Sequence, residues 1–110
     1  MKCRVRVLGV DAEVAESFAS RFAGLMARRG LPPGAGMLFR RCRAVHTLFM
    51  RFPIDVVFLG RDGRVVKAVR GVKPWRPCVW GGWRAASVLE LDSRNGDLEA
   101  ALAFAASNEK

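Results

Sequence analysis

The sequence predicts a mainly β fold with short helices (α+β), a single compact twisted β-sandwich or barrel. Residues 3–8 alternate apolar and basic side chains, the two-residue period of a strand that buries one face. Residues 55–59 are almost all apolar, and the Asp62-Gly63 dipeptide after them favours a tight hairpin turn before the apolar residues 65–66. A chain of 110 residues suits one hydrophobic core, so we expect a single domain over residues 1–110.

The N-terminal third is expected to hold a helical turn after the first strand. Between residues 13 and 26, apolar side chains recur every three or four positions, which is the spacing of a helix with one buried stripe. Residues 30–36 then concentrate glycine and proline, which favour a loop.

The rest of the chain is expected to be strands followed by a helix. Residues 45–50 and 55–59 predict two strand segments with a bend at Pro53. Residues 71–84 predict a long irregular connection that carries all three tryptophans, and residues 85–91 predict a closing strand. Asp97 follows an Asn-Gly turn and can cap a helix over residues 98–106.

The net charge of +9, from 19 basic and 10 acidic residues, implies attraction to polyanions such as nucleic acid. A genome rich in G and C would also produce this arginine-rich composition. Basic residues recur every third position from residue 61 to 76, and on a strand that spacing sends successive charges to opposite faces. We therefore favour a solvated basic surface over nucleic-acid binding.

The short apolar segments and the three cysteines predict a cytoplasmic protein. No apolar run is long enough to span a membrane, and the alternating N-terminus does not match a secretory signal. The three cysteines are widely spaced and odd in number, which favours free thiols in a reducing cytoplasm.

Several sequence blocks, in order, resemble the domain of unknown function 192 family (DUF192, also UPF0127). They are residues 21–26, 36–39, 42–59, 62–63, 74–76 and 88–91. The resemblance implies a twisted β-sandwich or barrel with short helices at its ends, and it implies no established activity. It also implies a last strand where this sequence favours a helix from Leu98 onward, and the tryptophans of residues 78–83 depart from the family pattern.

Cys42, His46 and Asp55 are the candidate catalytic residues, because a nearby base can convert a thiol into a nucleophilic thiolate. On an extended strand, Cys42 and His46 would lie about 13 Å apart, too far for a hydrogen bond without a bend. Cys42 is more simply a small buried side chain. Zinc ligation by Cys3, Cys42, Cys78 and His46 lacks the close cysteine pair of structural sites, so we expect no metal or other cofactor.

His46, Thr47, Asp55, Trp75 and Arg76 are the candidate ligand-binding residues, as a polar patch with an aromatic neighbour. The structural alternative pairs Asp55 with an arginine and buries the tryptophans at one end of the sheet. Trp75, Trp80 and Trp83 also interleave with basic residues, as in proteins that bind single-stranded nucleic acid.

The function that the sequence favours is a non-enzymatic module that binds a small molecule or a protein. A small enzyme with a Cys/His/Asp site is the first alternative, and a nucleic-acid-binding protein is the second.

Overall fold

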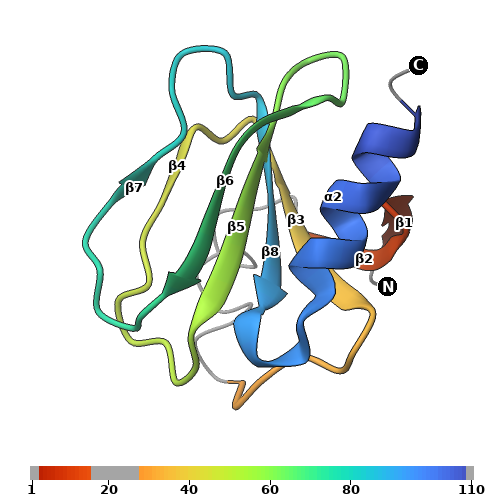
Figure 1. Ribbon diagram of the computed structural model, residues 1–110. Coiled ribbons are helices and arrows are strands. Elements are labelled where there is room, and N and C mark those ends of the chain that lie inside the picture. The colour runs from red at the N-terminus through yellow and green to blue at the C-terminus, as the bar shows by residue number, and fades with distance from the viewer. Residues whose placement is uncertain (1–2, 16–27, 109–110) are drawn as a thin grey trace.

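A mixed six-stranded sheet, a two-stranded antiparallel ribbon and a helix make up most of the part of the chain that the computed structural model describes, residues 3–15 and 28–108 (Figure 1). The strands are β1 (Arg4–Val7), β2 (Val10–Ala15), β3 (Ala35–Arg40), β4 (Ala44–Val45), β5 (Ile54–Leu59), β6 (Val65–Val72), β7 (Val79–Trp80) and β8 (Ser87–Asp92). A 3-10 turn, η1 (Ser93–Asn95), leads into the helix α2 (Asp97–Asn108). The mainly β fold with a C-terminal helix is confirmed.

One six-stranded sheet, in the order β1-β2-β3-β8-β5-β6, forms the centre of the molecule. β2 and β3 run parallel, and the other neighbours in this sheet run antiparallel. β4 and β7 pair separately as a short antiparallel ribbon. Since β1 and β6 are the two ends of this strand order, the sheet is open and twisted rather than closed into a barrel.

The inner strands of the central sheet are covered on both faces, which explains why all six residues of β5 are buried. Side chains on one face pack with the β4–β7 ribbon in a ribbon-side core that includes Phe52, Val56, Phe58 and Val79. The other face packs under α2 in a helix-side core that includes Val57, Leu59, Leu91, Leu98 and Ala101. The sheet therefore lies between the ribbon and the helix (Figure 1).

The hairpin between β5 and β6 forms at the expected dipeptide. Gly63 has a φ of 81°, a left-handed conformation that glycine adopts without strain. Its N–H donates to the carbonyl of Gly60 at 3.0 Å, and the N–H of Gly60 donates to the carbonyl of Arg64 at 2.9 Å. The predicted turn is confirmed.

The helix expected over residues 13–26 is wrong at its start. Residues 13–15 belong to β2, where Val10, Ala12 and Val14 are buried at alternate positions and the backbone pairs with β3. Val14 packs in the helix-side core and Ala15 in the ribbon-side core, so successive side chains point to opposite faces, as in a strand. The remainder of that expected helix, residues 16–26, lies outside the described residues.

Two other boundaries also differ from the sequence prediction. Only Val45 of the strand expected over residues 45–50 is extended in β4, because the N–H of Met50 turns back to the carbonyl of Thr47. The connection expected over residues 71–84 is less irregular than predicted, since β6 runs to Val72 and β7 interrupts the rest. The N-terminal and closing strands and the C-terminal helix form within a few residues of their expected bounds.

The helix α2 closes the fold where the family resemblance implies a strand. Leu98 and Ala101 are fully buried against the sheet, and Arg70 of β6 forms an ion pair with Glu99 of α2. This ion pair is solvent-exposed, and its hydrogen bond raises the pKa of Arg70. Within the described part of the chain, no helix has the length and hydrophobicity needed to cross a bilayer.

Candidate functional site

The candidate residues from the sequence divide between the faces and ends of the sheet. Cys42 packs in the ribbon-side core, and its Sγ donates to the carbonyl of Ala44 at 2.9 Å. Asp55 pairs across the sheet with Leu91 of the helix-side core, so its side chain points to the opposite face. The fold therefore does not bring Cys42 and Asp55 together.

Asp55 and His46 each have a backbone partner close by. The Oδ1 of Asp55, a buried side chain, accepts the N–H of Gly71 at 2.8 Å. Gly71 has a φ of 58° where the pairing of β5 with β6 shifts register, so this carboxylate satisfies an N–H at an irregular point of the sheet. The Nδ1 of exposed His46 accepts the N–H of Leu48 at 3.2 Å.

Thr47 ties together the two loops that follow β4 and β6. Its hydroxyl donates to the carbonyl of Lys73 at 2.6 Å and accepts the N–H of Arg76 at 2.8 Å. Its backbone N–H donates to the carbonyl of Arg76, and its carbonyl accepts the N–H groups of Trp75 and Met50. Since Thr47 is fully buried and these bonds engage its hydroxyl as both donor and acceptor, its role here is to hold the loops in place.

The two loops that Thr47 joins present an exposed aromatic pair, Phe49 and Trp75. The two rings lie 4.8 Å apart between centroids, at an angle of 60°. Phe49 is 54% exposed and Trp75 is 59% exposed, although both are large apolar side chains. Their φ angles, 64° and 72°, lie in the left-handed region, where a side chain with a Cβ is strained. The loops hold this pair outward at a conformational cost.

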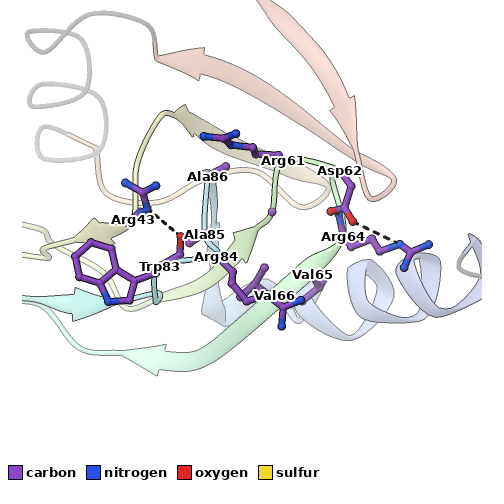
Figure 2. A pocket seen from close by; sticks show the side chains of 11 residues that line it. Arg43, Arg61, Asp62, Arg64, Val65, Val66, Trp83, Arg84, Ala85 and Ala86 are labelled. Carbon is purple, nitrogen blue, oxygen red and sulfur yellow. Dashed lines mark hydrogen bonds and ion pairs between the residues drawn. The ribbon is translucent and has the colours of Figure 1, made fainter.

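A second surface lies at the other end of β5 and β6, and the sequence reasoning did not single it out. A pocket of about 620 Å³ opens between the β5–β6 turn, the start of β6 and the segment before β8 (Figure 2). Its lining is Arg43, Gly60, Arg61, Asp62, Arg64, Val65, Val66, Trp83, Arg84, Ala85 and Ala86. We call it the arginine pocket, because four of these side chains are arginines.

The arginine pocket contains one acidic side chain, and a neighbour already engages it. Arg64 donates its backbone N–H to Oδ1 of Asp62 at 3.0 Å, and its Nε lies 3.8 Å from Oδ2. Arg43 lies across the pocket, where its Nε donates to the carbonyl of Trp83 at 3.2 Å and its guanidinium lies 5.9 Å from the Trp83 ring centroid. Among the described residues, neither Arg61 nor Arg84 makes an ion pair.

The sequence analysis noted several residues of this pocket but did not predict that they lie together. Arg61 and Arg64 belong to the basic series that a continuous strand would send to opposite faces, yet both precede β6 in a turn. Trp83 and Arg84 were expected within an irregular connection, whose path across the sheet cannot be read from local patterns. Arg43 lies more than 15 positions from the β5–β6 turn and reaches the pocket only through the fold.

The buried carboxylate of Asp92 lies at the end of β8, just before η1 and at the same end of β5 as the aromatic pair. Asp92 is 2% exposed and accepts hydrogen bonds from the side chain and backbone N–H of Arg94 and from the N–H of Leu31. The hydrogen bonds from the Arg94 side chain lower the pKa of Asp92, although burial acts in the opposite direction. Asp92 therefore has a structural role, joining β8 to the segment before β3.

Cys3 and Cys78 are the remaining candidates from the sequence, as thiols and as metal ligands. Cys3 and Cys78 are exposed, and Cys42 is buried. In residues 3–15 and 28–108, no group of three or more histidine, cysteine or acidic side chains is placed to hold a metal ion.

Comparison with known proteins identifies a matching family and a relative in sequence. The model of the domain of unknown function 192 family, described as Uncharacterized ACR, matches residues 2–98. A UPF0127 protein of Pyrococcus furiosus is 38% identical over 73 residues, which are 61% of this chain and 60% of that protein. This alignment thus spans less than two thirds of the relative's length.

Two crystal structures resemble most of the fold. One is a protein of unknown function from Novosphingobium aromaticivorans, with a TM-score of 0.72 and 24% identity, covering 83% of this chain and 68% of that one. The other, from Sinorhizobium meliloti, is described as a candidate transcription regulator. It has a TM-score of 0.71 and 27% identity, and the match covers 82% of this chain and 74% of that one.

Proposed function

This chain belongs to the domain of unknown function 192 family of uncharacterized proteins, and we propose that it is a non-enzymatic module that binds a partner protein through Phe49 and Trp75. The observation that carries the proposal is the exposed aromatic pair, two rings in tilted contact on two hydrogen-bonded loops. Aromatic side chains and arginine are enriched among the residues that dominate the energy of protein interfaces. Arg76 and His46, both exposed, flank the pair in sequence and supply a polar rim.

Rigid presentation supports the proposal further. A partner gains most from side chains that are already ordered before binding, because less conformational entropy is lost. The hydrogen bonds of Thr47 hold both loops, so the aromatic pair needs little rearrangement to bind. In this proposal Trp75, Arg76 and His46 contact the partner, whereas Thr47 and Asp55 support the surface from within.

The enzyme alternative has less support from the contacts. The Cys42 thiol is 7% exposed and donates to the carbonyl of Ala44, so its burial and its hydrogen bond leave it poorly placed to meet a substrate. Asp55 faces the other side of the sheet. We therefore keep binding as the proposed function, in a cytoplasmic setting that the thiols favour.

Native mass spectrometry of the protein purified from its own host tests the proposal. We expect a complex with a second protein whose mass is lost on denaturation. The Trp75→Ala variant should lose this complex, and Trp83→Ala, which removes an even more exposed tryptophan at the other end, should retain it. A complex that survives Trp75→Ala, or a bare chain in the wild type, would contradict the proposal.

A further inference from the structure

From its lining, we infer that the arginine pocket is a second binding site, for a nucleotide: a phosphorylated ligand that carries a planar base. This inference does not depend on the proposed partner protein, because the pocket lies at the opposite end of β5 and β6 from Phe49 and Trp75. It rests on the size of the pocket, its charge and its one exposed aromatic ring.

The size of the pocket suits a small organic ligand. Its volume of about 620 Å³ falls within the roughly 300–1,000 Å³ of small-molecule sites. Gly60 helps to keep it open, because a Cβ there would crowd Oδ1 of Asp62 at 3.1 Å and a methyl group of Val66 at 3.4 Å. Val65 and Val66, at the start of β6, add apolar side chains to the lining.

The charge of the pocket selects an anion. Asp62 is engaged by Arg64, so Arg43, Arg61 and Arg84 supply positive charge that no acidic side chain among the described residues neutralises. Arginine presents its donors in a planar fork that matches two phosphate oxygens at once. Figure 2 shows Arg43 and Trp83 on one side of the pocket and the Arg61–Arg64 turn on the other. In this inference the phosphate binds between these two sides of the pocket.

The exposed ring of Trp83 adds a platform for a base. Trp83 is 79% exposed, the most exposed of the large apolar side chains in the described part of the chain. It is held from two sides, since Trp80 packs edge-on at 5.1 Å between ring centroids and Arg43 lies near its ring. A held, exposed indole beside arginines is the combination on which nucleic acid bases stack while their phosphates pair with positive charge.

Two sources can supply this ligand, a free nucleotide or one unit of a single-stranded nucleic acid. The test therefore titrates the full chain with ADP and, separately, with a fluorescein-labelled oligothymidylate of about 12 nucleotides, within the site sizes known for single-strand binders. Inorganic pyrophosphate serves as the probe without a base. We expect saturable binding of ADP, of the oligonucleotide or of both, each at least about tenfold tighter than pyrophosphate.

Variants locate the binding in the pocket. Trp83→Ala should weaken nucleotide binding about tenfold without weakening pyrophosphate, since it removes only the stacking surface. Arg84→Ala should weaken both about threefold to fivefold at physiological salt. The matched control is Arg6→Ala, which removes the same charge from an exposed position on β1 at the far edge of the sheet.

Three results would overturn the inference. They are equal binding of pyrophosphate and ADP, unchanged nucleotide affinity in Trp83→Ala, and equal losses in Arg84→Ala and Arg6→Ala. The last would show that net charge rather than the pocket attracts the ligand. Trp75→Ala should leave nucleotide binding unchanged, which separates this inference from the proposed partner-protein surface.

Discussion

The two ends of the β5–β6 hairpin differ in where their polar side chains lie, buried at one end and exposed at the other. At the end near Ile54 and Val72, the polar side chains of Thr47 and Asp92 are buried and hydrogen-bonded within the chain, while aromatic rings face the solvent. At the turn end, about five residues or roughly 17 Å away along β5, the charges of Arg61 and Arg84 face the solvent instead.

This difference separates stability from binding. A buried polar group that loses its hydrogen-bond partner lowers the stability of the protein, because its desolvation is no longer compensated. Removal of an exposed arginine changes the stability little. We therefore expect substitutions of polar residues at the first end to lower stability, and substitutions of arginines at the second end to change ligand binding instead.

The strongest test of this contrast is Asp92→Ala. It leaves the N–H of Leu31 and the N–H groups of Arg94 without their carboxylate, so we expect the free energy of unfolding to fall by about 3 kcal/mol. Urea denaturation followed by circular dichroism measures the change. A loss of less than about 0.5 kcal/mol would show that this end does not depend on its internal hydrogen bonds.

Thr47→Val tests the same end with a nearly unchanged shape. The substitution removes the hydroxyl that bridges Lys73 and Arg76, so a carbonyl and an N–H lose their partner. We expect a loss of about 2 kcal/mol in the same denaturation experiment. Thr47→Ser keeps the hydroxyl and serves as the control; if it destabilises as much as Thr47→Val, packing of the methyl group rather than hydrogen bonding accounts for the loss.

Local patterns in the sequence predict the strands and the hairpin of this fold but not the meeting points of its loops. Alternation identified β1, and Asp62-Gly63 identified the turn, because both are encoded by neighbouring residues. The split of residues 45–50 into a strand end and a turn depends instead on Thr47 bonding to residues 73–76, nearly 30 positions away. No periodicity in residues 45–50 reports that contact.

The same distinction applies to the candidate sites. Trp75 and Arg76 lie beside Thr47, as the expected patch requires, whereas Asp55 points to the helix-side face because strand alternation sends it there. The arginine pocket joins Arg43, the β5–β6 turn and Trp83. The pairing of β5 with β8 brings the turn to the segment before β8, and the pairing of β4 with β7 brings Arg43 there. Pairing between distant strands is the step that sequence patterns leave open.

A smaller effect on stability is expected at low pH, because the pKa of Asp92 is lowered in the folded state. The carboxylate contributes stability at pH values above about 3.9, the usual pKa in an unfolded chain, and loses it as the pH falls through the lowered pKa. The difference in urea midpoint between wild type and Asp92→Asn should therefore narrow below about pH 4. A difference that stays constant down to pH 2 would contradict the assigned role of this carboxylate.

The smallest effect is expected at the arginine end. Arg61→Ala and Arg84→Ala, alone or together, should change the free energy of unfolding by no more than about 0.5 kcal/mol, because both side chains are exposed and make no ion pair within the described residues. Removal of one of several neighbouring positive charges also reduces their repulsion, so any change in the free energy of unfolding should be an increase. The urea midpoint of the double variant measures this. A clear destabilisation would mean that these arginines hold the fold together, and the contrast between the two ends would fail.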